Sequence, residues 1–110
     1  MSSKSSKIKT LLPMAGSVEE FINKFDNNKF VIKIDGMPLL EKTTYGFKDY
    51  IDPIYLIPKD QVKAPIFHQI AERNQATIVS ITEKTNSVLD TLLYADKFVN
   101  DSDEVLIIHP

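Results

Sequence analysis

The sequence contains no cysteine, and its 110 residues carry a formal net charge of only −2. Without cysteine the chain can form neither disulfides nor thiolate metal sites, so it does not report its redox compartment. The near-neutral charge gives no electrostatic basis for binding nucleic acid or an anionic membrane. No apolar run approaches the roughly 20 residues that span a bilayer. We therefore expect neither a nucleic-acid partner nor a membrane partner.

The first seven residues are rich in serine and lysine. They lack the apolar segment of a secretory signal, so we expect residues 1–7 to be a disordered leader and the protein to be cytoplasmic. Residues 8–110 are enough to bury a hydrophobic core, about 60–70% of the unfolded surface. They should form a single domain, or the N-terminal portion of a larger one.

Four short apolar runs alternate with helical patterns along the chain: residues 8–12, 53–57, 77–81 and 105–108. Continuous apolar runs of this length are typical of parallel strands that are buried on both faces. Right-handed crossovers between them would place helices on both sides of the sheet. The expected fold is therefore a three-layer α/β, Rossmann-like sheet. We expect the strand order 3-2-1-4, which places the loop after the first strand at the topological switch point.

The segment between the first two runs contains three local signals. Ser17 followed by Glu20 fits a capping box and predicts a short helix through Lys24 or Phe25. Residues 30–34 are rich in strand-forming side chains. They end at Asp35-Gly36, a strong turn signal that predicts a turn rather than a catalytic aspartate.

Apolar residues at intervals of three or four predict three further helices. The first would begin at Pro38 and carry an apolar stripe of Leu40, Thr44, Phe47 and Ile51. The second would run over residues 65–73 with Ile66, Phe67, Ile70 and Ala71 inward. The third would be capped by Ser87 and pack through Leu89, Leu92, Leu93, Ala95 and Phe98.

The loop after the first strand is the candidate functional segment. The apolar strand breaks at Pro13 and ends in a small-residue turn, Ala15-Gly16-Ser17. A glycine in this position of an α/β sheet lets the backbone approach a phosphate or base closely. The alternative is a buried strand followed by an ordinary turn. The candidate nucleotide-binding residues are Leu12, Pro13, Met14, Ala15, Gly16 and Ser17.

Several segments together resemble the sugar-phosphate nucleotidyltransferases, which join a nucleoside triphosphate to a sugar phosphate. Residues 11–16, Leu-Leu-Pro-Met-Ala-Gly, look like the opening strand and nucleotide loop of that family. Residues 28–41 look like its next block, with a strand, an Asp-Gly turn and a helix. Residues 60–77 and 106–109 are similar in layout to its second helix and its metal-site strand. The resemblance covers residues 8–110 and only the N-terminal part of the family's domain.

The resemblance implies a nucleotide site with Lys29 as a candidate catalytic and nucleotide-binding residue, and Mg²⁺ as the cofactor of a catalytic form. It also implies that residues 30–34 lie off the main sheet. The family's metal-binding aspartate would fall just after Pro110, so no metal ligand is placed.

Key family positions differ in this chain. The family's loop reads Gly-x-Gly-x-Arg, whereas here Val18 replaces the second glycine and Glu20 replaces the arginine. Residues 84–86, Lys-Thr-Asn, stand where the family has a glycine-rich turn that binds the base. A carboxylate at position 20 repels the triphosphate that an arginine would neutralise. We therefore expect a domain that is not catalytic on its own and that binds a nucleotide or sugar nucleotide weakly.

Two alternatives remain open from the sequence. The chain could be an active or truncated sugar-phosphate nucleotidyltransferase, or a regulatory or interaction domain with no nucleotide site. A four-stranded sheet also leaves an edge open after its last strand. We therefore expect a missing C-terminal region, a homo-oligomer, or a partner chain that covers this edge.

The remaining polar residues predict less. Nothing pairs His68 with His109 at metal-ligand spacing, and we expect His68 to serve helix packing. His109 ends the last strand, where sites of α/β proteins lie, and is a weaker candidate. Asp101, Asp103 and Glu104 are expected to form a solvated turn, since a calcium loop needs a longer series of ligands.

Overall fold

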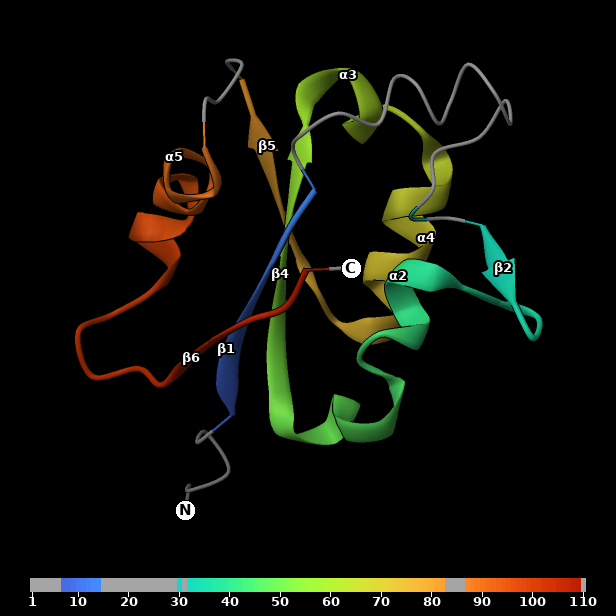
Figure 1. Ribbon diagram of the computed structural model, residues 1–110, viewed down its shortest axis with the longest axis horizontal. Coiled ribbons are helices and arrows are strands. Elements are labelled where there is room, and N and C mark those ends of the chain that lie inside the picture. Colours follow the sequence, from blue (N-terminus) through green and yellow to red (C-terminus); the bar gives the residue numbers. More distant parts are fainter. Residues whose placement is uncertain (1–6, 15–29, 31, 83–86, 110) are drawn as a thin grey trace.

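A four-stranded, fully parallel sheet forms the centre of the computed structural model (Figure 1). The structure describes residues 7–14, 30, 32–82 and 87–109. The sheet order is β5-β4-β1-β6. Its strands are β1 Ile8–Pro13, β4 Ile51–Pro58, β5 Thr77–Ile81 and β6 Val105–Ile107. Numbered along the chain, these four strands lie in the order 3-2-1-4, so both the parallel pairing and the predicted order are confirmed.

Strand β4 has a proline near its start and another at its end, Pro53 and Pro58. Neither has an N–H group to donate to a neighbouring strand. The Met14 N–H donates to the Leu56 carbonyl at 2.9 Å, so even-numbered residues of β4 face β1 and odd-numbered ones face β5. Pro53 therefore faces the β5 side, but β5 starts only opposite Ile54. Pro58 faces the β1 side, where β1 ends opposite Leu56. Pro53 thus precedes the residue opposite the start of β5, and Pro58 faces Met14, one residue beyond β1, so neither proline removes a bond within the two neighbouring strands.

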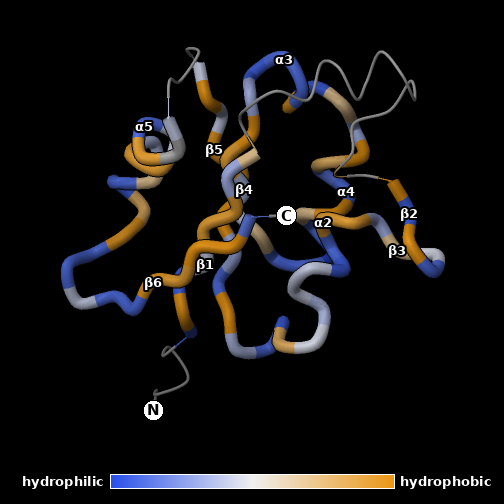
Figure 2. Tube along the Cα trace, viewed as in Figure 1, coloured by the Kyte–Doolittle hydropathy of each residue, from blue (hydrophilic) through white to orange (hydrophobic). Residues whose placement is uncertain are grey.

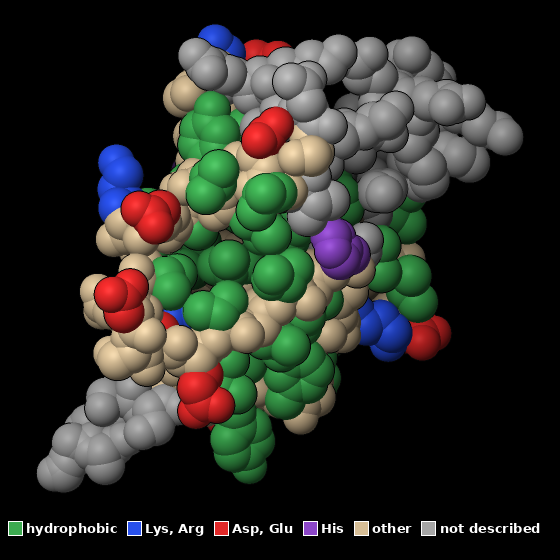
Figure 3. All heavy atoms as spheres, turned by 60° about the vertical axis from the view of Figure 1, so that its left-hand side comes forward, with side chains coloured by type: hydrophobic (Ala, Val, Ile, Leu, Met, Phe, Trp, Pro, Cys, Tyr) green, Lys and Arg blue, Asp and Glu red, His purple; other side chains and the backbone are tan. Residues whose placement is uncertain are grey.

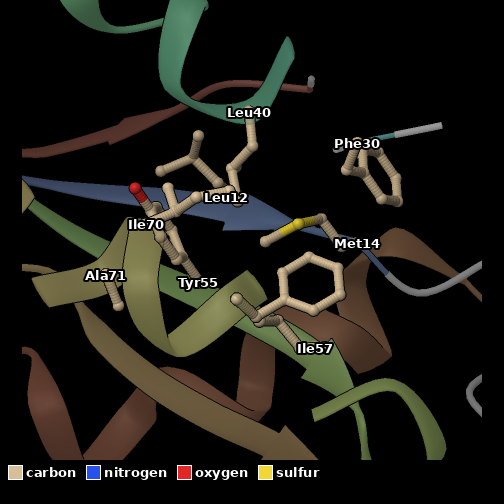
Figure 4. Close-up of a cluster of buried hydrophobic side chains, with 9 residues drawn as sticks. Leu12, Met14, Phe30, Leu40, Tyr55, Ile57, Ile70 and Ala71 are labelled. Carbon is tan, nitrogen blue, oxygen red and sulfur yellow. The ribbon is translucent and has the colours of Figure 1, made fainter. Parts of the chain in front are cut away.

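Helices cover both faces of the sheet. Helices α2 (Leu39–Lys42) and α4 (Pro65–Asn74) lie on one side and α5 (Val88–Leu92) on the other, as Figure 1 shows. Because side chains alternate along a strand, Leu12 and Tyr55 face the α2–α4 layer while Leu11 and Ile54 face the other layer. Figure 4 shows the first cluster, which contains Leu12, Met14, Phe30, Leu40, Tyr55, Ile57, Phe67, Ile70 and Ala71.

The smaller elements follow from local signals. Helix α3 (Lys59–Val62) leads to α4, which has a proline in its first turn and ends at Gln75 in the left-handed conformation. Strands β2 (Lys33–Ile34) and β3 (Met37–Pro38) form an antiparallel hairpin off the main sheet. Its turn residues Asp35 and Gly36 have φ of 56° and 82°, which confirms the predicted turn. The strand predicted over residues 30–34 is shorter than expected. Among the described residues of this range, only β2 is a strand.

The single helix predicted from Pro38 to about Ile51 is wrong. The structure has the short α2 followed by a 3-10 segment, η3 (Tyr45–Tyr50). The Thr43 hydroxyl donates to the Leu40 carbonyl at 2.8 Å, and Thr44 departs from helical geometry with φ −118°. Threonine hydroxyls that bond nearby carbonyls compete with the helix, and Gly46 lowers helix propensity further. Leu40, Thr44 and Ile51 are nevertheless buried, so the apolar pattern identified core residues but not the element.

The helix after Ser87 is only partly as predicted. The Ser87 hydroxyl accepts the Asp90 N–H at 3.2 Å, which confirms the N-cap. After α5 the chain tightens into a 3-10 segment, η4 (Leu93–Phe98). Among the side chains of α5 and η4 that the structure describes, Thr91 and Ala95, one helical turn apart, are buried.

Leu89 and Leu93 lie two residues from Thr91, about 200° around the helix axis, and so point away from the sheet. They are 67% and 61% exposed, and Phe98 is 38% exposed. The prediction that these three side chains pack inward is therefore wrong. The pattern failed because a threonine occupies the buried ridge, where its hydroxyl donates to the Ser87 carbonyl at 3.2 Å.

Hydropathy along the chain follows this architecture. Figure 2 shows hydrophobic residues along β4 and β6 and hydrophilic ones at α3. Within the described ranges, none of the helices has the length and apolar character needed to cross a bilayer.

The buried Tyr55 hydroxyl generates a first prediction. Tyr55 is fully buried, and its hydroxyl has no hydrogen-bond partner among the described residues. Tyr55→Phe removes this orphaned polar group, so we expect the free energy of unfolding to stay equal or rise by up to about 1 kcal/mol in urea denaturation. Tyr50→Phe, at a tyrosine that is 71% exposed, is the matched control and should change nothing. A loss of more than 1 kcal/mol on Tyr55→Phe alone would show that an ordered water bonds the hydroxyl.

Candidate functional site

The carboxyl end of β1 lies at the topological switch point of the sheet. β1 has β4 on one side and β6 on the other. Helix α2, between β1 and β4 in the chain, lies on one face of the sheet, whereas α5, which precedes β6, lies on the opposite face. Open α/β sheets bind ligands in the crevice outside the strand ends at such a point. This is the position at which the sequence predicted the nucleotide loop.

The first three candidate residues form the buried base of that loop. Leu12 and Met14 are fully buried and Pro13 is buried. Figure 4 shows Leu12 and Met14 within the cluster under α4. Because the Met14 N–H is bonded to Leu56 and Pro13 has no N–H, these residues anchor the end of β1 and offer no free donor to a ligand.

The other predicted binding residues lie outside the described residues. These are Ala15, Gly16, Ser17 and Lys29, together with Val18 and Glu20 of the same loop and the turn over 84–86. The helix predicted after Ser17 also falls in this range. For all of them the sequence-based interpretation stands as a prediction.

His109 lies at the same end of the sheet. Ile108 donates its N–H to the Leu11 carbonyl at 3.0 Å, so pairing with β1 continues beyond Ile107. Continuing the register of Leu11 with Ile107 sets His109 beside Pro13, at the strand end where α/β sites form. The His109 side chain is exposed and accessible to a ligand at the switch point.

His68 has the packing role that the sequence predicted. Its Nε2 atom lies 2.7 Å from the Val62 carbonyl, which fixes the short link between α3 and α4. The acidic turn before β6 is likewise local, because an Asp103 carboxylate oxygen accepts the Asn100 N–H at 2.7 Å. Within the part of the chain that is described, no three His, Cys, Asp or Glu side chains gather closely enough to hold a metal ion.

The strongest charge pair was not predicted from the sequence. Arg73 on α4 donates two hydrogen bonds to the Glu41 carboxylate on α2, at 2.8 and 3.3 Å. These bonds lower the pKa of Glu41 despite the opposing effect of its burial. Burial raises the pKa of the nearby Tyr55 hydroxyl well above its usual value, and the Glu41 charge raises it further. The pair joins two helices and leaves the switch point untouched, so its role is structural.

A second surface of the molecule is apolar and exposed. It is formed by two segments that follow each other in the chain, the α5–η4 helix and strand β6. Figure 3 shows hydrophobic side chains gathered on this side of the molecule, with acidic side chains along the rim. We call it the apolar face, and it consists of Leu89, Leu93, Phe98, Val105 and Ile107. Leu106 is also exposed, but its side chain lies on the opposite face of the sheet, next to that of Thr10.

The Glu41–Arg73 pair generates a second prediction. Because the folded pKa of Glu41 lies below its ordinary 4.5, the stability from this pair is present above that value. It is lost as the pH falls through the folded pKa. Arg73 is half exposed and partly screened by solvent. We therefore expect Glu41→Gln to cost only about 1 kcal/mol near pH 7 and clearly less near pH 3, measured by urea denaturation.

Asp35→Asn is the control for Glu41→Gln. It breaks the looser, exposed pair with Lys42, whose N–O distance is 3.6 Å, and asparagine tolerates the positive φ of position 35. Its unfolding free energy should match that of the unmodified chain at both pH values. A cost of Glu41→Gln that is equal at low and neutral pH would contradict the assigned pair.

Comparison with known protein families, with curated proteins and with solved structures finds no match to this chain.

Proposed function

We propose that this chain is a nucleotidyltransferase-like domain that binds a nucleotide or sugar nucleotide weakly and is not catalytic on its own. The observation that carries the proposal is the strand order, which sets the end of β1 between β4 and β6 at a switch point. The finer fold assignment, a Rossmann-like domain of the nucleotide-diphospho-sugar transferase type, belongs to the same proposal.

Weak binding follows from what the strand end supplies. Nucleotide contacts in such a loop come largely from backbone amides, which do not depend on the side chain at each position. The loop that follows the anchored Met14 contains Ala15, Gly16 and Ser17 in sequence. Lys29 adds one basic group, and the exposed His109 lies at the same sheet edge.

The proposed absence of catalysis follows from charge. Nucleotidyl transfer depends mainly on positioning and on cations that neutralise the phosphates. Mg²⁺ would supply this in a catalytic form, held by carboxylates. Here Glu20 stands where the resembled family has an arginine. Exchanging one positive for one negative group beside a triphosphate costs a few kcal/mol at surface dielectric, or about a hundredfold in affinity.

A regulatory or interaction domain is the second candidate, and the apolar face favours it. Surfaces of this kind on a protein domain mark sites of association. The two candidates are compatible, because the apolar face and the strand-end crevice are separate regions of the molecule.

Calorimetric titration tests the proposed binding. We expect nucleoside triphosphates with Mg²⁺ to bind with dissociation constants of about 0.1 mM or weaker. We expect no pyrophosphate release with a panel of sugar phosphates. Turnover above background would favour the alternative of an active or truncated enzyme, with Lys29 as the first residue to replace.

A double substitution tests the assigned loop. Val18→Gly with Glu20→Arg restores the family pattern and should tighten nucleotide binding by about tenfold or more. Glu72→Arg on the exposed surface of α4 makes the same change in net charge away from the strand ends, so it is the control. Equal affinities of the double variant and the control would show that the loop does not contact the nucleotide.

A further inference from the structure

No described strand pairs with the outer backbone edge of β6, which is an end strand in the order of the described strands. The Lys9 N–H donates to the Glu104 carbonyl and the Ile108 N–H donates to the Leu11 carbonyl, each at 3.0 Å. Backbone groups alternate in direction along a strand, so those of Val105 and Ile107 point away from β1. Two donors and two acceptors are therefore available for another strand.

Within its three residues, this edge strand carries none of the side chains or bulges that usually prevent pairing. Natural edge strands carry charges, prolines or bulges that prevent pairing with another chain. β6 is instead Val105-Leu106-Ile107, and these side chains are 45%, 40% and 43% exposed. An open edge with three consecutive apolar residues favours strand addition.

The apolar surface continues from this strand onto the helix above it. The register pairs Val105 with Lys9 and Ile107 with Leu11, so both side chains lie on the sheet face that η4 and α5 cover. Helix α5 contacts β1, the neighbour of β6. The exposed Leu89 of α5 and Leu93 of η4 thus add to the apolar surface on this side of the molecule (Figure 3).

We propose that a second copy of this chain docks on the apolar face, with the two β6 strands paired antiparallel around a twofold axis at Leu106. In this register Val105 forms a hydrogen-bonded pair with Ile107 of the partner subunit, so the outward groups meet each other. It is also the register that pairs the whole three-residue strand. Centring the axis on Val105 or Ile107 would leave one end of the strand unpaired.

The position of the acidic turn also favours antiparallel self-association. The turn before β6 is acidic, with Asp101, Asp103 and Glu104, whereas the strand ends at His109. Antiparallel pairing sets Asp103 opposite His109 of the partner subunit. A parallel arrangement would bring the two acidic turns together and would leave a free edge for further copies, whereas the twofold arrangement closes.

The size of the apolar face is sufficient for a dimer. Its five side chains, at about 200 Å² each and 38% to 67% exposed, present roughly 500 Å². Two copies that cover all of it would then bury roughly 1,000 Å², the approximate threshold for a specific interface. The proposal is independent of nucleotide binding, and the two can fail separately.

Sedimentation velocity on the full chain from about 1 to 100 μM tests the association. We expect a monomer–dimer equilibrium with no larger species. Ile107→Lys and Leu93→Lys should each raise the dissociation constant by about tenfold or more, because each places a charge in the interface. Circular dichroism confirms that each variant is folded.

Ile34→Lys is the matched control, since Ile34 is also a strand isoleucine that is 43% exposed, but on the β2–β3 hairpin. It should leave the dissociation constant unchanged. A monomer at every concentration would overturn the proposal. Equal weakening by Ile34→Lys and Ile107→Lys, with Leu93→Lys neutral, would overturn it as well.

A disulfide test fixes the register. The chain has no cysteine, so Leu106→Cys introduces a unique thiol. At a non-hydrogen-bonded antiparallel pair the two Cα atoms lie about 4.5 Å apart, which suits a disulfide. Mild oxidation should therefore cross-link Leu106→Cys rapidly. In the proposed register the two Val105 residues are offset by two positions along the strands. Val105→Cys should therefore cross-link far more slowly. The reverse order, or no difference, would overturn the proposed register.

Discussion

Burial of a parallel sheet on both faces is the constraint on which the rest of this structure depends. β1 and β4 present side chains alternately to two helical layers, with Leu12 and Tyr55 on one side and Leu11 and Ile54 on the other. Both strands are buried over their carboxyl-terminal parts, while the charged Lys9 and Asp52 pair at their partly exposed starts, so neither strand has a continuous polar face. The helices are placed by this requirement, and the ion pair between Glu41 and Arg73 joins the two helices of one layer above the buried Tyr55.

The strands of the sheet are not equally buried. Tyr55, Leu56 and Ile57 in β4 are fully buried, whereas all three residues of β6 are exposed. The same asymmetry links both proposed functions. Well-packed strands position the end of β1, where we propose the nucleotide site, while the uncovered strand next to it supplies the surface on which we propose association. The apolar face and the proposed nucleotide site therefore lie on neighbouring strands, β6 and β1.

The strands could be predicted because their signal is local and strong. Short continuous apolar runs bounded by turn residues have few interpretations other than buried strands, and the crossover rules then restrict their order. The helices were harder to predict, because the side of a helix that is buried depends on the residues at one or two positions. Thr91 is buried by its tertiary contacts, and the Thr43 hydroxyl competes with the helix by bonding a nearby carbonyl. The apolar periodicity of the sequence indicates neither effect.

The candidate site was predicted in position but only partly in composition. The end of β1 lies where the sequence placed it, with Leu12 and Met14 as its buried base. The Glu41–Arg73 pair gave no signal, since 32 residues separate its members and each reads as an ordinary surface charge. His109 could be placed from sequence because its position depends only on where the last strand ends.

The two prolines of β4 have a consequence for how reliably the chain folds. A strand that slips along its neighbour by two residues keeps its hydrophobic side inward, so side-chain burial alone discriminates poorly against this error. Here such a slip would bring Pro53 opposite β5 or Pro58 opposite β1, and a ladder donor would be missing. The prolines therefore act as stops at both ends of the central strand, so that misaligned sheets are less stable than the native one.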